Sequence, residues 1–176
     1  MPAALIDRHM PCYDVRARYA VTVDASAGKA YDAVRSLNLA SSPIIRALFR
    51  LRGLPTGRFD RSRLKQLGFV ELGEHIGSEY VMGLIGRFWT PGGDVQRMAD
   101  AEAFDRFADR RFAKAVWNFT VRAAHDGRSE VATETRVACL SPPARRRFRI
   151  YWTLLGPFSG WIRREALKIV KRSAED

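Results

Sequence analysis

The stretch SPPARRRFRIYWTLLGPFSGWIRREALKIVKR, residues 141–172, decides how the rest of the chain must fold. Ser141 is a favourable N-cap, and Pro142 stands where the first helical residue needs no backbone donor. Aromatic and aliphatic side chains then recur every three or four residues, which is the spacing of one helix face. The sequence predicts a long amphipathic helix. Its apolar stripe needs a broad partner, and we expect that partner to be a curved sheet.

The other faces of this predicted helix are basic. They carry Arg145, Arg146, Arg149, Arg163, Arg164, Lys168, Lys171 and Arg172. Near the middle, the Gly156-Pro157 step removes a backbone donor and should kink the helix or split it in two. We expect the half before this step to form a cavity wall and the half after it to close the core. The apolar residues of the two halves are Phe148, Tyr151, Trp152 and Leu155, then Ile162, Ala166, Ile169 and Val170.

Length and composition are typical of one soluble globular domain, which we expect to span residues 1–176. No run approaches the roughly 20 apolar residues that are needed to cross a bilayer. The N-terminal segment carries Asp7, Arg8 and His9 where a signal peptide would have its apolar core. We therefore expect a cytoplasmic protein.

The formal net charge is +11, and arginine supplies most of it, with 25 Arg against 5 Lys. Such a charge attracts anionic surfaces, whether phospholipid, nucleic acid or an acidic protein. The arginine bias equally fits a GC-rich genome, so both explanations stay open. Residues 50–67 form a basic, loop-rich connection without a fold-specific nucleic-acid motif, which makes nucleic acid an unlikely partner.

Cysteine and histidine offer no predicted metal site. Cys12 and Cys139 lie in or beside strand-like segments, and we expect buried free thiols rather than a disulfide. The three histidines show no metal-ligand spacing with them. No serine, histidine or cysteine set forms a catalytic constellation. The sequence therefore predicts no cofactor and no metal, and it leaves open whether any residue is catalytic.

The remaining segments predict a sheet. Residues 11–24 alternate as a half-buried strand, and two short helices capped by Ser26 and Ser42 follow. Residues 68–74 and 78–89 are typical of strands, whereas 94–111 are ambiguous between strand, helical turn and loop. Residues 112–140 predict a hairpin around Asp126-Gly127. The fold class is α+β, with a curved antiparallel sheet of about six or seven strands around the long C-terminal helix.

The turn of this hairpin decides which side chains face inward. A two-residue turn places Trp117 opposite Arg136 and Phe119 opposite Glu134. The acid and the base would then lie on the inner face, where they could bind the polar head of an apolar ligand. A three-residue turn instead puts Thr133, Thr135 and Val137 inside and leaves both charges in water. We adopt the inward register and keep the other as its alternative.

Several phrases resemble the SRPBCC superfamily, also called START-like or helix-grip. They are VTVDASAGKAYDAV (21–34), GRFWTPGG (86–93), ATETRVACLSPPARRRFRIYW (132–152) and GPFSGWIRREAL (156–167). The chain looks like an uncharacterised bacterial branch of it. The resemblance implies a seven-stranded antiparallel sheet around the C-terminal helix, with an apolar cavity that binds a hydrophobic small molecule. No catalytic residue can be carried over.

We therefore expect a lipid, polyketide or aromatic metabolite to bind in this cavity. An alternative is a polyketide cyclase or aromatase in which Glu134, Arg136 or Tyr151 moves protons. Another is binding of an anionic membrane or a partner through the basic helix face. The protein could be a monomer or a homodimer. The candidate lining residues, for which plain core packing is the alternative, are Trp89, Trp117, Phe119, Glu134, Arg136, Tyr151, Trp152, Leu155 and Ile162.

Overall fold

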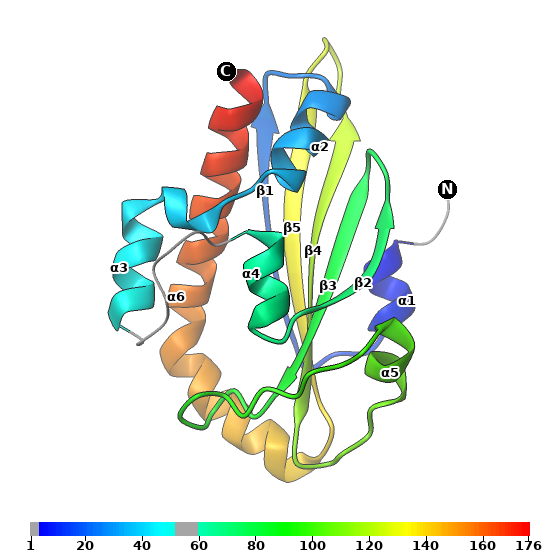
Figure 1. Cartoon of the computed structure of the whole chain (residues 1–176), viewed down its shortest axis with the longest axis vertical. Helices are drawn as coiled ribbons and strands as arrows, with labels where there is room; N and C mark the ends of the chain where they lie inside the picture. The colour runs from blue at the N-terminus through cyan, green and yellow to red at the C-terminus, as the bar shows by residue number, and fades with distance from the viewer. Residues whose placement is uncertain (1–3, 52–59) are drawn as a thin grey trace.

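The computed structural model describes residues 4–51 and 60–176 (Figure 1). Its elements are α1 (Leu5–His9), β1 (Val15–Val23), α2 (Ala27–Arg35), the 3-10 helix η1 (Leu39–Ser41), α3 (Pro43–Leu51), α4 (Arg61–Gln66), β2 (Val70–His75), β3 (Glu79–Gly86), α5 (Ala101–Arg106), β4 (Ala113–Ala123), β5 (Ser129–Cys139) and α6 (Pro142–Glu175). The two short helices after the first strand are confirmed as α2 and α3. Residues 61–66, which we expected in a loop, form α4 because Asp60 caps the N–H of Arg63.

The sheet is antiparallel with the strand order β1-β5-β4-β3-β2. It has five strands among the described residues, so the expectation of six or seven strands is wrong. Among its described residues, the ambiguous segment after β3 pairs with the sheet only at an isolated bridge between Gln96 and Ile85, and its helix α5 packs on β2 and β3. Gly92, Gly93 and Asp94 all have positive φ there, and a chain that turns in this way cannot continue as an extended strand.

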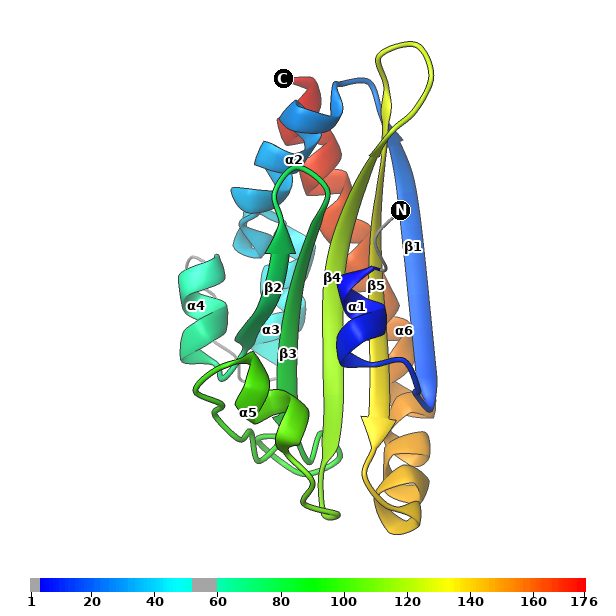
Figure 2. The same cartoon turned by 90° about the vertical axis from the view of Figure 1, so that its right-hand side faces the viewer.

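Helices cover both faces of the sheet. The inner face packs against α2 and α6, and the outer face packs against α1 and α5, as Figure 2 shows from the side. The larger core lies on the inner side around Tyr31, Phe119 and Val170. A second core, around Ile6, Val81 and Phe104, fills the space under α1 and α5. Because the outer face also has a covering, polar residues there can be buried.

The C-terminal helix is confirmed as the longest element, with 34 residues. Ser141 is its N-cap and accepts a hydrogen bond from the N–H of Ala144. Pro157 lies inside the helix without splitting it. The axis changes direction between the yellow-orange and red parts in Figure 1, so the step bends one continuous helix.

The hairpin of β4 and β5 has the register of the alternative that we did not adopt. Trp117 pairs with Thr135, and Phe119 pairs with Thr133. The backbone of Ala124 and Arg128 closes the turn, so that three residues, His125 to Gly127, lie between them. One extra turn residue reverses the face of every following side chain. The predicted inward position of Glu134 and Arg136 is therefore wrong.

Candidate functional site

A cavity of about 660 Å³ lies between the inner face of the sheet and α6. A smaller lobe of about 170 Å³ shares several of its walls and reaches towards the N-terminal end of α6. The residues common to both are Phe69, Leu84, Phe88, Trp117, Tyr151, Ser159 and Arg163. The larger lobe has the size of sites that hold metabolite-sized ligands, about 300–1,000 Å³. Its walls combine aliphatic and aromatic side chains with a few polar groups.

The sheet and the helix each hold their part of the wall rigidly. Trp117 lies on β4, and its indole Nε1 donates to Thr133 Oγ1 of β5 at 2.6 Å. On α6, the Phe148 and Trp152 rings stack with centroids 5.6 Å apart, and Tyr151 packs against Phe148 at 5.7 Å. Helical spacing brings these aromatic residues onto the same side as Ser159 and Ile162. The predicted stripe thus becomes one wall of the cavity.

Two arginines line the larger lobe, and Arg163 is the buried one, whereas Arg97 is exposed. The Arg163 side chain is buried between α6 and β5, with 9% of its surface exposed. Nε donates to Thr135 Oγ1 at 2.7 Å, and Nη1 donates to the Ser159 carbonyl and hydroxyl at 2.7 and 2.5 Å. Burial lowers the pKa of Arg163 to about 10, and no described Asp or Glu forms an ion pair with it. It is still protonated at neutral pH, so the cavity contains a cation without a counterion.

The candidate residues occupy different places relative to the cavity. Trp117, Tyr151 and Ile162 line the larger lobe, and Trp152 lines the smaller one. The remaining inner-face candidates, Phe119, Trp89 and Leu155, line neither lobe. Phe119 borders a gap of about 20 Å³ beside α2, and Trp89 packs on the cluster around Phe148.

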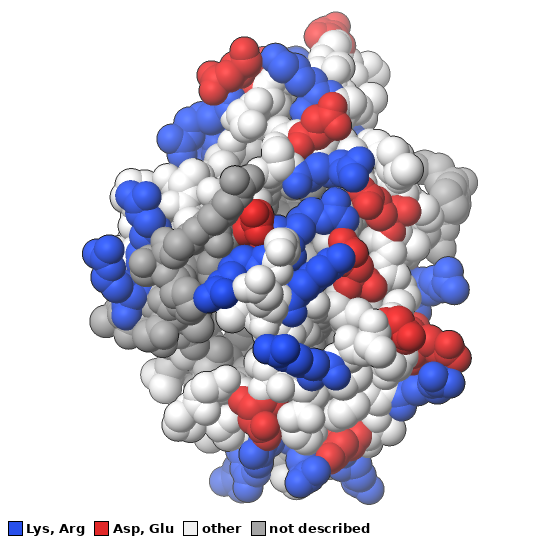
Figure 3. Space-filling view, viewed as in Figure 1, with Lys and Arg blue, Asp and Glu red and all other residues white. Residues whose placement is uncertain are grey.

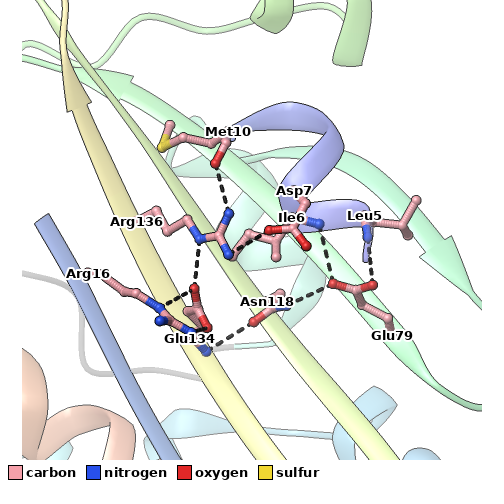
Figure 4. A network of polar contacts seen from close by, with 9 residues as sticks. All are labelled: Leu5, Ile6, Asp7, Met10, Arg16, Glu79, Asn118, Glu134 and Arg136. Atoms are coloured by element: carbon pink, nitrogen blue, oxygen red, sulfur yellow. Dashed lines mark hydrogen bonds and ion pairs between the residues drawn. The ribbon is translucent and has the colours of Figure 1, made fainter. Parts of the chain in front are cut away.

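Glu134 and Arg136 lie on the outer face, yet they are not in water, because α1 covers them (Figure 4). They are 7% and 6% exposed. Arg136 Nε donates to Glu134 Oε1 at 2.7 Å, and Arg16 binds both oxygens of Glu134 at 2.8 and 2.9 Å. Burial raises the pKa of Glu134, but the hydrogen bonds from the two arginines outweigh it and hold the pKa below its ordinary value. One part of the alternative prediction is met and the other is not: its register is right, but its placement of both charges in water is wrong.

This polar network fastens α1 to the sheet. Arg136 Nη1 donates to the Met10 carbonyl at 2.9 Å, and Nη2 forms an ion pair with Asp7 at 2.7 Å. At the other end of α1, Glu79 Oε2 accepts the Leu5 N–H at 2.8 Å. Asn118 links the two halves, since it donates to Glu79 Oε1 and accepts the Glu134 N–H. The arrangement is a structural one, far from the cavity across the sheet.

The sequence interpretation missed Arg163, Ser159 and Thr135 as cavity residues. Arg163 was assigned to the basic faces of the helix, but it follows Ser159 by four residues and precedes Val170 by seven. This is the spacing of the apolar stripe itself. A cation at a stripe position is the signal that could have identified it.

Other predicted sites are reported for the described residues. Both cysteines are free thiols, and Cys139 is buried as expected, whereas Cys12 is exposed. No group of three or more potential metal ligands occurs in residues 4–51 and 60–176. In the same part of the chain, no helix is long and apolar enough to span a bilayer.

Basic side chains gather over the centre of the face that α4 occupies (Figure 3). Several of them are neutralised there, because Arg61 and Lys65 pair with Glu71 at 2.5 and 2.6 Å. Burial raises the pKa of Glu71, but hydrogen bonds from Lys65, Arg61 and Tyr80 lower it to about 2. This cluster is internally compensated, unlike Arg163. The middle of the basic segment, residues 52–59, lies outside the described residues.

Comparison with known proteins gives distant structural matches only. No protein-family model matches the chain, and no curated protein matches it. A hypothetical protein from Helicobacter pylori is similar with a TM-score of 0.43 and 8% identity, over 99% of this chain and 97% of that one. Ara h 8.0201 is similar with a TM-score of 0.30 and 9% identity, over 91% of this chain and 97% of its own.

The di-domain aromatase/cyclase BexL from the BE-7585A biosynthetic pathway is similar with a TM-score of 0.36 and 11% identity, over 92% of this chain. StfQ, from the steffimycin pathway, has a TM-score of 0.33 and 14% identity over 90% of this chain. This chain spans less than half the length of both, 47% and 44%. Matches at this level assign neither a family nor an activity. The functional argument therefore rests on the contacts within this chain.

Proposed function

We propose that the chain is a ligand-binding protein of the helix-grip type, which holds a hydrophobic small molecule between its sheet and α6. The observation that carries the proposal is the cavity of about 660 Å³ with its mostly apolar walls. Covering the apolar surface of a ligand stabilises a complex by about 25 cal/mol per Å². A lipid, a polyketide or an aromatic metabolite would gain most from such walls.

The polar groups that line the cavity favour binding over cyclase-type catalysis. The described residues that line the two lobes include no carboxylate and no histidine. Glu134 and Arg136, two of the candidate proton-transfer residues, lie on the outer face under α1. Tyr151 is the remaining one. General acid–base catalysis works best with a group whose pKa lies near the operating pH, and neither a phenol nor a guanidinium is ordinarily matched to neutral pH.

The experiment fills the cavity from one wall. Ser159 of α6 lines both lobes, and Ser159→Phe would place a ring in them. We expect the affinity for a fluorescent apolar probe to fall by about tenfold or more, because the lost space removes apolar contact area. Ser173→Phe at the exposed end of the same helix is the matched control and should bind as the native protein does. Equal affinity in all three proteins would contradict binding in this cavity.

A second candidate function is docking on an anionic bilayer, and one specific observation favours it. The outward side of α6 exposes four apolar side chains at helical spacing: Ile150 (62%), Leu154 (68%), Phe158 (40%) and Trp161 (44%). The described protein places no element over them. Residues 142–164 contain no acidic residue. Arg146, Arg147, Arg149 and Arg164 flank the stripe and form no ion pair with a described residue.

Apolar side chains between free cations match the chemistry of an interface of acyl chains and anionic headgroups. Vesicle sedimentation with phosphatidylserine-containing and neutral vesicles tests this function. We expect binding only to the anionic vesicles, a release by high salt and a loss of about tenfold or more for Leu154→Ser. Ile76→Ser is the control, because Ile76 is even more exposed and lies in the β2–β3 turn. Binding that ignores lipid charge, or a homodimer that buries Leu154, would overturn this candidate.

A further inference from the structure

The feature that calls for an explanation is the guanidinium of Arg163, which is buried against apolar walls without a counterion. A buried cation loses several kcal/mol of hydration, and an opposite charge normally compensates for it. The other buried arginine, Arg136, follows this rule, since it contacts both Glu134 and Asp7. Among the described residues, Arg163 has only neutral hydrogen-bond partners, the two hydroxyls of Thr135 and Ser159 and one backbone carbonyl.

The guanidinium also keeps donors free towards the cavity. Its Nε and Nη1 are used, and Nη2 donates to no described residue. Every buried polar side-chain atom of the described chain has a hydrogen-bond partner. Nη2 has no such partner, so it is not fully buried and must face accessible space. Arg163 itself lines both lobes of the cavity.

Two hydroxyls converge on the same point. Thr135 Oγ1 and Ser159 Oγ each accept a hydrogen bond from Arg163, which leaves the hydrogen of each hydroxyl available for donation. Both residues line the smaller lobe. A planar cation with two flanking hydroxyls suits a small oxyanion, and a guanidinium in particular suits the planar geometry of a carboxylate.

We propose that the ligand is an amphiphilic carboxylate whose head binds Arg163 Nη2 with help from Ser159 and Thr135, and whose apolar body fills the cavity. This inference rests on the ligand-binding function proposed above. Trp117 and Tyr151 line the same two lobes as Arg163, so the body of the ligand would pack against these two side chains. Such a ligand supplies the missing counter-charge and buries its own apolar surface in the same event.

Isothermal titration with decanoate and decanol tests the head group, because the two probes share one apolar chain. We expect the native protein to prefer decanoate by about tenfold to a hundredfold, the usual effect of a hydrogen bond to a charged group. In Arg163→Met, the ratio of the decanoate affinity to the decanol affinity should fall close to one, while the decanol affinity itself changes by less than about threefold. Arg163→Lys keeps the charge and should retain part of the preference.

Arg172→Met is the matched control, since it removes the same charge from an exposed position of α6 and should keep the full preference. Circular dichroism checks that each variant is folded. Equal binding of both probes by the native protein overturns the carboxylate inference but leaves the proposed function in place. If Arg163→Met still prefers decanoate over decanol, the carboxylate inference is likewise overturned and the proposed function stays in place. Failure of both probes to bind overturns the inference and the proposed function together.

Discussion

Replacing Glu134 by Gln tests whether the acid on β5 fastens α1 or serves the cavity. The side chain accepts three charge-assisted hydrogen bonds, at 2.7 Å from Arg136 and at 2.8 and 2.9 Å from Arg16. Removing one partner of a buried ion pair costs about 3–5 kcal/mol. The lower end applies, because Arg136 keeps Asp7 and the Met10 carbonyl. The half-exposed Arg16 adds less than about 1 kcal/mol. We expect a loss of about 3 kcal/mol.

Urea unfolding followed by circular dichroism measures this loss. A change of about 3 kcal/mol lowers the urea midpoint by roughly 1.5 M at a typical dependence on denaturant. The matched control is Glu130→Gln on the same strand, because Glu130 pairs with Arg18 at the surface. A surface pair contributes less than about 1 kcal/mol. Ligand affinity should be unchanged in both variants, since neither acid lines the cavity.

The pH dependence supplies a second measurement of the same contact. The pKa of Glu134 is lower in the folded protein than in the unfolded chain, where it is about 4.3. Its contribution is therefore fully present above pH ~4.3 and is lost as the pH falls through the folded pKa. The gap in stability between the native protein and Glu134→Gln should narrow below pH ~4. A gap under about 1 kcal/mol at pH ~7, or a loss of ligand binding without a loss of stability, would refute this account.

Two further variants test how the outer face is packed. Glu79→Ala removes the acceptor of the Leu5 N–H. The amides at the start of α1 should then exchange with deuterium about tenfold faster, which mass spectrometry would detect. Unchanged exchange would contradict the role of Glu79. Gly83→Ala places a Cβ at 2.7 Å from the Phe104 ring and should cost about 1–3 kcal/mol. In thermal unfolding, Gly28→Ala is its control, because nothing lies within 4 Å of the added Cβ; equal melting temperatures for both variants would contradict the close contact.

The sequence alone was sufficient for the elements whose signals are local. The cap at Ser141 and the apolar spacing of residues 148–170 predict α6, and both lie within one helix. The alternation of residues 11–24 predicts β1, and the Asp-Gly pair predicts the β4–β5 hairpin. These signals are read over a few neighbouring residues, because helix and strand periods depend on local backbone geometry. The fold class followed from their order.

The candidate site depended on contacts that no local pattern contains. One additional residue in the hairpin turn placed Thr135 rather than Arg136 beside Trp117, because side chains alternate between the two faces of a strand. The burial of Glu134 and Arg136 depended on α1, more than 120 residues earlier in the chain, as the bond from Arg136 to Met10 illustrates.

The burial of Arg163 at the cavity likewise depends on contacts that no local pattern contains. Its helical position is fixed by the sequence, whereas its burial without a counterion depends on β5 and the cavity walls meeting around it. The sequence thus determined the long helix with its apolar stripe and the antiparallel hairpin. The tertiary structure decided which buried charges are compensated and that Arg163 lines the cavity, because the burial of these charges depends on segments that are distant in the chain.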